Sequence, residues 1–387
     1  MMTRTRDRLR RDGPSFVDLE ALVPAAPSWR IDWSTVWSLW PEFAALDTCP
    51  QDPRHHGEGD VGTHTRMVVE ALVADAEWRA LPAEARERLF WTAVLHDVGK
   101  PATTREEDGR ITSRGHSRRG AAIARRLLWE AHAPFAWREA LCGLITCHQL
   151  PFWLIEREDS ERRAIEASWT VRPDHLCLHA RADARGRIAV DSDGLIENVA
   201  LARLAFEEAG CLAGPFPFAN DESRVAFFER EDRDPRHAAH EDHPCTVTVM
   251  AGLPGSGKDH WISRHRPDLP VVSLDTLRAE LGASPTGNQG AVVQAARERA
   301  RQHLRAGRDF VWNATNVTQQ MRGRVLDLLR AYGARIHIVY LEVPPDRLLA
   351  QNADREAMVP AKAILSLVDK LEPPTPMEAH LITHVLT

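Results

Sequence analysis

The sequence predicts two domains of different class: an all-helical domain, then an α/β domain built on a parallel sheet. The chain has 387 residues, which is enough for two or three separate hydrophobic cores. Apolar residues recur at helical spacing as far as residue 186, and ten of the twelve tryptophans lie before residue 170. Beyond residue 245, short β-branched runs alternate with helical segments, which is typical of a parallel sheet.

Helical spacing marks five segments in the first part of the chain, and prolines are expected to end them. The segments are 64–80, 84–97, 116–132, 135–149 and 174–186, with stops at Pro82, Pro134 and Pro151. The tryptophan-rich stretch at 33–43 is also interpreted as helical packing. We expect this helical domain to occupy residues 1–228.

Four β-branched runs predict the strands of the second domain, which we place at residues 245–387. The runs lie at 246–253, 270–275, 309–316 and 335–343. Between the two domains, the stretch EREDRDPRHAAHEDHP at 229–244 is highly charged and predicts a linker.

The composition argues against several classes of protein. The net charge of −6 argues against a broad basic surface for nucleic acid, and leaves room only for a local basic cleft. The arginine-rich start is followed by no apolar stretch, so we expect neither a signal peptide nor a membrane span. The six cysteines, none in a C-x-x-C pair, predict reduced thiols in a cytoplasmic protein; they are Cys49, Cys142, Cys147, Cys177, Cys211 and Cys245.

Lysine is scarce, and its placement points to two phosphate sites. Only four lysines occur among the 49 basic residues, at positions 100, 258, 362 and 370. Lys100 lies in VLHDVGKPATT and Lys258 in GLPGSGKDHW. A compact ammonium and a planar guanidinium do not substitute freely at a crowded phosphate, so both motifs are candidate sites.

Six ionisable residues lie in or beside the predicted helices, where several helices can bring them into one pocket. They are His64, His96, Asp97, His116, His148 and Asp183. Imidazole nitrogen with carboxylate oxygen suits Mn, Fe, Co, Ni, Zn or Mg rather than a soft thiolate metal. Lys100 follows Asp97 by three residues, on the same helical face if the helix continues that far, where it can hold a phosphate oxygen.

The other histidines of this region could be metal ligands or ordinary surface or packing residues, and the second role is the commoner one for a lone histidine. We expect that role for His55, His132, His175 and His179, whereas the motif HHGEGDVGTHT leaves His56 undecided.

The motifs GTHTRMVV, LHDVGKP, RGHSRRGA, TCHQLP and RADARGR resemble, in order, those of HD-superfamily metal-dependent phosphohydrolases. They are most similar to the branch that includes the HD domain of bacterial tRNA nucleotidyltransferases, and they span about 55–187. The resemblance implies one metal among His64, His96, Asp97 and Asp183, and a second held by His116 and His148. One metal would activate a water while the other holds the phosphate.

The second motif has the form of a phosphate-binding loop, because its glycines follow an apolar strand and open a helix. Its candidate nucleotide-binding residues are Gly252, Gly255, Ser256, Gly257, Lys258 and Asp259. Backbone N–H groups would converge on the phosphates of ATP or another NTP with Mg²⁺, and Lys258 would contact the β- and γ-phosphates.

Asp259 departs from the usual pattern, which has Ser or Thr after the lysine. A carboxylate in the first turn of a helix is favourable in itself, so Asp259 could serve only the helix end. The same helix end is meant to hold phosphate, however, and the two negative charges repel. We therefore favour Asp259 as a ligand of the magnesium ion, directly or through water.

Polar residues after the next strands predict the acceptor side of a kinase. Asp275 is placed to take the proton of an attacking hydroxyl, and Arg278 to hold the phosphate of the acceptor; a simple N-cap is the alternative for Asp275. Arg355 is expected on a closing lid that neutralises charge. A solvated surface position is at least as strong an expectation for three other arginines, Arg322, Arg324 and Arg347.

This half resembles the polynucleotide 5′-hydroxyl kinases of end-healing enzymes, through GLPGSGK, the pair Asp275 and Arg278, NATN and the Arg355 lid. It departs from them at Asp259, and at Ala353, where related chains often carry another arginine. HD domain followed by kinase resembles the bifunctional end-healing enzymes, which clear a 2′,3′-cyclic phosphate or 2′-phosphate at one RNA or DNA end. They phosphorylate the 5′-hydroxyl at the other, and a nucleic-acid ligase would act downstream.

Two other interpretations stay open. One is a nucleotide-pool enzyme in which an HD nucleotidase is fused to a small-molecule kinase. The other is a regulatory module whose HD pocket binds a nucleotide without turnover, which the complete ligand set disfavours. Transfer of phosphate to an oligonucleotide in preference to a mononucleoside would distinguish the first interpretation from the nucleotide-pool enzyme.

Overall fold

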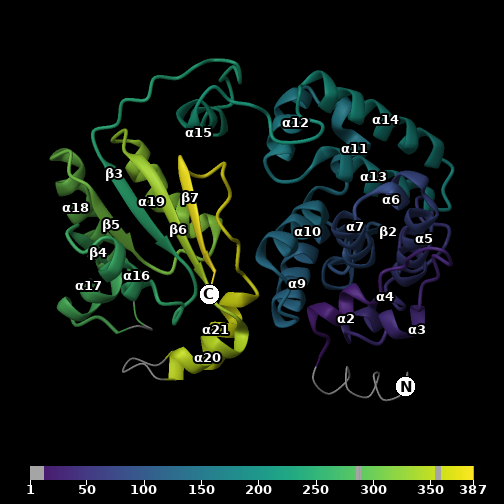
Figure 1. The fold of residues 1–387 in the computed structure, drawn as a ribbon, viewed down its shortest axis with the longest axis horizontal. Helices are drawn as coiled ribbons and strands as arrows, with labels where there is room; N and C mark the ends of the chain where they lie inside the picture. The colour runs from purple at the N-terminus through teal and green to yellow at the C-terminus, as the bar shows by residue number, and fades with distance from the viewer. Residues whose placement is uncertain (1–12, 285–286, 288, 354–358, 387) are drawn as a thin grey trace. The chain divides into compact units, whose positions relative to one another are not determined.

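A computed structural model describes residues 13–284, 287, 289–353 and 359–386. The chain divides into two compact units, Met1–Pro217 and Phe218–Thr387 (Figure 1). The first is helical, as predicted, and the second contains a parallel sheet, also as predicted. Among the described residues, no helix combines the length and the apolarity that crossing a bilayer requires.

The first unit consists of helices and one short hairpin that the sequence did not suggest. The hairpin pairs β1 (Arg105–Glu107) with β2 (Arg110–Thr112) in antiparallel register. The helices are α2 (Phe16–Glu20), α3 (Trp33–Val36), α4 (Glu42–Leu46), α5 (Val61–Ala74), α6 (Ala76–Ala80), α7 (Ala83–Leu95), α8 (Lys100–Thr103), α9 (His116–Glu130), α10 (Phe135–Cys147), α11 (Leu150–Trp153), the 3₁₀ turn η1 (Leu154–Glu156), α12 (Ser160–Ser168), α13 (Pro173–Arg185) and α14 (Ser192–Glu208).

The helix ends follow local chemistry, and several of them differ from the expected breaks. Asp60 caps α5 by accepting a hydrogen bond from the N–H of Thr63 at 2.8 Å. The predicted helix 64–80 is two helices, because Asp75 is extended and caps α6. Pro82 and Pro134 lie directly before α7 and α10, and Pro151 lies in the first turn of α11, so each of these prolines begins a helix rather than ending the preceding one.

The core of the first unit contains several buried tryptophans among mostly aliphatic side chains. Trp78 and Trp91 are fully buried, and the indole N–H of Trp91 donates to the carbonyl of Leu19 at 3.1 Å. The stretch 33–43 forms α3 and the start of α4, and Phe43 is buried there against the rings of Trp37 and Trp40. This packing fixes the helices whose ends carry the candidate ligands.

The second unit is a parallel sheet of five strands in the order β4-β5-β3-β6-β7. The four predicted strands are confirmed, and a fifth, β7, closes one edge. The strands are β3 (Thr246–Ala251), β4 (Val271–Ser273), β5 (Phe310–Asn313), β6 (Arg335–Glu342) and β7 (Leu381–Leu386). The helices of this unit are α15 (Asp221–Glu229), α16 (Lys258–His265), α17 (Leu274–Glu280), α18 (Gly290–Arg305), α19 (Gln319–Arg330), α20 (Pro345–Ala353) and α21 (Ala361–Val368).

The chain divides earlier than the sequence suggested, between Pro217 and Phe218 rather than after residue 228. The reason is α15, whose Arg224 donates to the backbone carbonyls of Pro376, Ala379 and His380 at 2.9–3.0 Å. The helix therefore belongs to the second unit. The charged stretch 229–244, expected to link two domains, lies within that unit as well.

All six cysteines are free, in keeping with the expectation of reduced thiols. Five are buried and Cys147 is half-buried. Burial raises the pKa of the thiols of Cys142, Cys147 and Cys177 to about 12, which keeps them protonated and unreactive.

Candidate metal centre and phosphate-binding loop

The six predicted metal ligands come together in the interior of the first unit. His96 and His148 directly follow the last residues of α7 and α10, and His116 is the first residue of α9. Each of the six residues is at most 5% exposed; they are His64, His96, Asp97, His116, His148 and Asp183. Helix ends thus carry most of the ligands, because a terminal residue can turn its side chain inward without interrupting helix packing.

The tautomers of the four histidines are set by their hydrogen bonds. In each ring Nδ1 faces a backbone carbonyl oxygen, which can only accept a hydrogen bond. The proton therefore lies on Nδ1, and Nε2 keeps its lone pair. The four Nδ1 to O distances are His64 to Gly186 3.2 Å, His96 to Ala93 2.8 Å, His116 to Ser113 2.8 Å and His148 to Ile145 2.7 Å.

These lone pairs converge with no proton between them. His116 Nε2 lies 3.3 Å from His148 Nε2, and His64 Nε2 lies 3.2 Å from an oxygen of Asp183. Atoms that each present a lone pair repel at such distances unless a cation lies between them. Four buried atoms of the cluster have no hydrogen-bond partner among the described residues: His64 Nε2, His96 Nε2, Asp97 Oδ1 and Asp183 Oδ2. The donor set therefore fits divalent cations.

Asp97 connects two groups of possible ligands. Its Oδ2 lies 3.2 Å from His96 Nε2, and its Oδ1 lies 3.4 Å from His116 Nε2 and 4.0 Å from His148 Nε2. The ligand atoms of His64, His96 and Asp97 lie within 4.8 Å of one another, and so do those of Asp97, His116 and His148. The arrangement offers two adjoining cation positions that share one carboxylate.

Two basic side chains hold the carboxylates. Lys100 Nζ lies 2.7 Å from Asp97 Oδ2 and donates to Gln51 Oε1 at 2.7 Å. Arg187 donates to Asp183 Oδ1 through Nε and Nη2, at 3.1 and 2.9 Å. Burial alone would raise the pKa of Asp97, but His96 and Lys100 outweigh it and hold that pKa well below its usual range. Both carboxylates are therefore ionised and ready to bind a cation.

Residues near the centre that the sequence reading did not place there include Glu58, Arg187 and His179. The RADARGR motif contained Arg187 one turn after Asp183, and His179 lies one turn before Asp183, so helical spacing could have marked both. His179 is fully buried, its ring centroid is 5.4 Å from that of His96, and its nitrogens lack a hydrogen-bond partner among the described residues. It was expected to be an ordinary packed residue, and it packs against the centre.

The undecided His56 lies at the centre, 4.8 Å from His64 between ring centroids. His55 and His132 are exposed and His175 is buried, and none of these three belongs to a ligand cluster within the described part of the chain.

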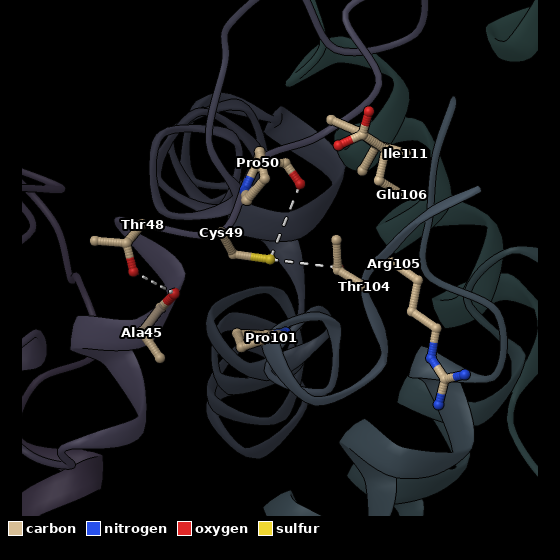
Figure 2. Close-up of a pocket in the computed structure, with 9 residues that line it drawn as sticks. All are labelled: Ala45, Thr48, Cys49, Pro50, Pro101, Thr104, Arg105, Glu106 and Ile111. Atoms are coloured by element: carbon tan, nitrogen blue, oxygen red, sulfur yellow. Dashed lines mark hydrogen bonds between the residues drawn. The ribbon is translucent and has the colours of Figure 1, made fainter. Parts of the chain in front are cut away.

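A cavity of about 380 Å³ is lined by Pro101 of α8 and by Thr104 directly after that helix (Figure 2). The Cys49 thiol lies 3.4 Å from the Thr104 hydroxyl across it, and the hairpin supplies Ile111 and the charged Arg105 and Glu106. The remaining lining residues are Ala45, Thr48, Pro50 and Pro101. The cavity thus combines apolar walls with a charged rim.

The phosphate-binding loop of the second unit lies where the sequence predicts, between β3 and α16. Gly252 has φ +143°, and a Cβ there would lie 2.5 Å from the carbonyl oxygen of Leu341. Gly257, with φ +90°, precedes Lys258, the first residue of α16. Lys258 Nζ donates to the carbonyls of Gly252 and Leu253, both at 2.9 Å, so the lysine lies across its own loop.

Two further residues of the loop, Ser256 and Gly255, have close surroundings. The hydroxyl of Ser256 is buried and has no hydrogen-bond partner among the described residues. A Cβ on Gly255 would lie 3.4 Å from Cβ of Asn352, so α20 packs closely against the loop. The helix α20, which belongs to the segment expected to form a lid, therefore lies next to the phosphate-binding loop.

Asp259 lies in the first turn of α16 and contacts the neighbouring strand. Its Oδ1 accepts a hydrogen bond from Asn313 Nδ2 at 2.6 Å, and Asn313 is the last residue of β5. The carboxylate thus faces the edge where the parallel strands end, rather than serving only its own helix.

Asp275 and Arg278 are brought together on the surface of α17. Arg278 donates to Asp275 through Nη1 and to Gln289 Oε1 through Nε at 2.9 Å. The Asp275 side chain is 77% exposed. Ser273 is the N-cap of α17 and accepts from the N–H of Thr276, so the alternative that Asp275 is only an N-cap is wrong.

The other four arginines that the sequence analysis considered differ in their surroundings. Arg322, weighed as a surface residue, is buried and donates to both oxygens of Glu378 at 2.7 and 2.9 Å, so it is structural. Arg324 and Arg347 are exposed. Arg355, the expected lid residue, lies outside the described residues.

Another group of possible ligands, Glu222, His243 and His380, lies in the second unit. The backbone N–H of Ile336 donates to His380 Nδ1 at 3.0 Å, which places the imidazole proton on Nε2. That proton points at Glu222 Oε2, 2.8 Å away. The group is therefore a hydrogen-bonded connection between α15 and the sheet, and His380 has no free lone pair for a metal.

Two models of known families match the chain, one in each unit. The model described as HD domain matches residues 61–174, and the model described as AAA domain matches residues 247–374. The first match contains five of the six candidate ligands and the second contains the phosphate-binding loop.

The curated relatives resemble part of the chain only. Proteins named Multifunctional CCA protein are 43% identical over 109 residues (Halorhodospira halophila), 32% over 162 (Actinobacillus pleuropneumoniae) and 34% over 180 (Methylococcus capsulatus). These matches cover 28%, 40% and 43% of this chain and 23%, 37% and 40% of the relatives. The chain therefore spans less than half the length of each of these three.

Two solved structures match the chain weakly. A sugar kinase from Janibacter is 20% identical, with a TM-score of 0.29, and covers 36% of this chain and 86% of its own. A putative kinase from Chloroflexus aurantiacus is 15% identical, with a TM-score of 0.32, and covers 37% and 86%. Neither TM-score is high enough to support an argument. The family models and the geometry together show that this chain joins a helical HD domain to a P-loop kinase-like domain with a five-stranded parallel sheet.

Proposed function

We propose that the protein repairs broken nucleic-acid ends with two activities. The HD domain hydrolyses 2′,3′-cyclic phosphate or 2′-phosphate ends, and the kinase-like domain transfers the γ-phosphate of an NTP to a 5′-hydroxyl. The observation that carries the proposal is the group of buried Nε2 lone pairs and carboxylate oxygens that face one another beside Lys100. A buried donor set of this kind, next to an ammonium group that contacts one of its carboxylates, suits a bound phosphate ester.

In the HD domain, the protein residues hold and orient the reacting groups. Divalent metals such as Mn, Co, Ni, Fe or Zn would supply a Lewis acid and a hydroxide at neutral pH. Asp97 and the four histidines would hold them, and Arg187 fixes Asp183 in the orientation needed. Lys100, 8% exposed, is placed to contact a non-bridging phosphate oxygen and neutralise charge that develops on it.

A nucleic-acid substrate is supported by the first half of the chain. The motifs resemble the HD domain of bacterial tRNA nucleotidyltransferases, and the curated relatives that match are named Multifunctional CCA protein. The cavity beside α8 gives the substrate room outside the metal centre, and its charged rim includes Arg105.

In the kinase-like domain, the groups for phosphoryl transfer lie around the phosphate-binding loop and the strand ends. Lys258 would leave its loop carbonyls for the β- and γ-phosphates, and Asp259 with Asn313 would orient Mg²⁺. Asp275 would accept the proton of the attacking 5′-hydroxyl, and Arg278 would then hold an acceptor phosphate. The high exposure of Asp275 leaves this side open to a polymer.

The two activities are complementary at a break. One leaves a free 3′ end and the other a 5′-phosphate, which is the arrangement that a nucleic-acid ligase requires. We therefore expect a ligase as the downstream partner and a cytoplasmic site of action.

One experiment tests both activities and distinguishes the main rival. The full chain is incubated with an RNA that bears a 5′-hydroxyl and a 2′,3′-cyclic phosphate, with labelled NTP, Mg²⁺ and a transition metal. We expect loss of the cyclic phosphate and labelling of the 5′ end, with oligonucleotide preferred over mononucleoside. Preference for mononucleosides would favour a nucleotide-pool enzyme, and binding without turnover would favour a regulatory module.

A further inference from the structure

Glu58 lies in the loop before α5 and has a carboxylate that is fully engaged and almost inaccessible. Its side chain is 1% exposed. Oε1 lies 2.9 Å from His64 Nδ1 and 2.8 Å from His56 Nδ1, while Oε2 accepts the backbone N–H of Ile188 at 2.9 Å. One carboxylate therefore faces two imidazole rings with one oxygen and a distant loop with the other.

The hydrogen bonds determine where the protons lie. His64 Nδ1 is shared between Glu58 and the carbonyl of Gly186, and both partners only accept hydrogen bonds. A proton on Nδ1 satisfies both, and it leaves the His64 Nε2 lone pair for the centre, where Asp183 lies 3.2 Å away. The Nδ1 proton of His56 points at the same carboxylate oxygen.

His64 differs in this respect from the other three candidate histidine ligands. His96, His116 and His148 have neutral backbone carbonyls opposite Nδ1. A carboxylate in that place fixes the ring orientation more strongly and raises the basicity of the ligating nitrogen. Among these four ligands, His64 is thus the one whose affinity for a cation depends on an acidic side chain.

The surroundings keep Glu58 outside the centre. His56 and the N–H of Ile188 engage both oxygens of the carboxylate, which lies on the Nδ1 side of His64, away from the Nε2 lone pair that faces Asp183. Gly57 brings the loop close, because its N–H donates to the Ile188 carbonyl at 2.8 Å and a Cβ on Gly57 would lie 2.8 Å from that oxygen. The loop is thereby joined to the residue that follows Arg187.

We infer that Glu58 is a positioning residue of the HD centre: it fixes the tautomer and orientation of His64, and His56 holds it in that role. The inference rests on the proposed metal-binding function of the centre. In the sequence HGE at 56–58, His56 and Glu58 would thus orient a metal ligand without binding the metal themselves.

Metal affinity measured on the full-length protein tests this directly. Metal-free protein is titrated calorimetrically with Mn²⁺ or Co²⁺, comparing wild type, Glu58→Gln, His56→Asn and, as matched control, Glu107→Gln in the exposed strand β1. We expect Glu58→Gln to weaken binding by roughly 10–100-fold. His56→Asn should weaken binding less, and Glu107→Gln should not change it. Equal affinity for Glu58→Gln and wild type would overturn the inference.

A double-mutant cycle separates positioning from a general loss of structure. If Glu58 acts through His64, then Glu58→Gln adds little to the loss already caused by His64→Ala. Additive losses would show that Glu58 acts elsewhere and would refute the role. Where His64→Ala binds too weakly to measure, the absorption spectrum of the Co²⁺-saturated proteins decides. It should change in Glu58→Gln, and a spectrum identical to wild type would refute the role.

Far-ultraviolet circular dichroism and the melting temperature of each variant report whether the helical first unit, which contains Glu58, is folded. Because no measurement above requires turnover, failure of the wild type to hydrolyse cyclic phosphates would contradict the proposed function and leave the role of Glu58 standing. Failure of the wild type to bind a divalent metal would contradict both.

Discussion

The two candidate sites differ in how far the fold alone assembles them. In the HD domain the six candidate ligands are at most 5% exposed, and their rings are held by backbone carbonyls. In the kinase-like domain, Asp275 is 77% exposed and Lys258 lies across its own loop. The first site is pre-organised. In the second site, Lys258 is hydrogen-bonded to carbonyls of its own loop and Asp275 is paired with Arg278, so both must change partners when substrates bind.

This difference follows from the chemistry proposed for each site. A metal centre needs its ligands fixed before the ion arrives, because each misplaced ligand lowers affinity. A phosphoryl-transfer site must admit two substrates and can complete its arrangement as they bind. Substitutions in the HD centre should therefore act chiefly through metal affinity, whereas removal of the exposed Asp275 carboxylate should act through kinase turnover.

The largest expected effect is the loss of one activity without the other. Asp97→Ala removes the carboxylate that connects both ligand groups, so metal binding and phosphoesterase activity should be abolished while the kinase rate is kept. Both rates are measured on the same preparation, with exposed Asp193→Asn as control. Loss of both activities in folded Asp97→Ala protein would contradict the assignment of two separate sites.

Next in size is the proposed base of the kinase. Asp275→Asn keeps the shape of the side chain and removes the proton acceptor, so turnover should fall by roughly 10²–10⁴-fold while NTP binding survives. Phosphate transfer to an RNA 5′-hydroxyl and nucleotide affinity are measured in parallel, with exposed Asp268→Asn as control. Near-normal turnover would leave Asp275 only its ion pair with Arg278.

The same comparison shows what sequence can predict. The HD ligands were predicted as a set because short motifs at helix ends place them at fixed positions on elements that must pack together. The strands and the phosphate-binding loop were predicted from β-branched runs followed by glycines. In both cases the signal and the structure it predicts lie within a few residues of each other.

What sequence reading missed depends on contacts between distant residues. Glu58 acquires its place through Ile188, and Arg322 is buried because Glu378, after several intervening elements, supplies a carboxylate. The chain divides before α15 for the same reason, since the partners of Arg224 lie at residues 376–380. No local pattern marks such pairs; a single sequence shows only a charged residue that could equally face solvent.

Asp259 should give a smaller effect that is specific to metal dependence. Asp259→Ala removes a carboxylate from the phosphate site, so the Mg²⁺ concentration for half-maximal kinase rate should rise by roughly 10-fold. Asp259→Ser, which restores a neutral oxygen, should recover much of the loss, and Asn313→Ala should give a weaker shift in the same direction. An unchanged Mg²⁺ titration in Asp259→Ala would reduce the carboxylate to a helix-end charge, and phosphoesterase activity should not change in any variant.

The smallest expected effect concerns stability in acid, and it belongs to the sheet of the second unit. His337 on β6 is largely buried and shares a 2.9 Å hydrogen bond with the Thr383 hydroxyl on β7. Burial, aided by Arg266, lowers the pKa of its imidazole from 6.5 to about 4. Above pH 6.5 the ring is neutral in both folded and unfolded chains. As the pH falls from 6.5 to about 4, only the unfolded chain gains a proton, so the folded state loses stability over that range.

His337→Gln, which can still hydrogen-bond Thr383, should remove this contribution. The melting temperature of the wild type relative to His337→Gln should therefore drop by only a few degrees between pH 6.5 and pH 4, and stay constant above pH 6.5. Exposed His240→Gln is the matched control and should follow the wild type. Parallel curves for wild type and His337→Gln across the whole range would show that His337 takes up its proton equally in both states.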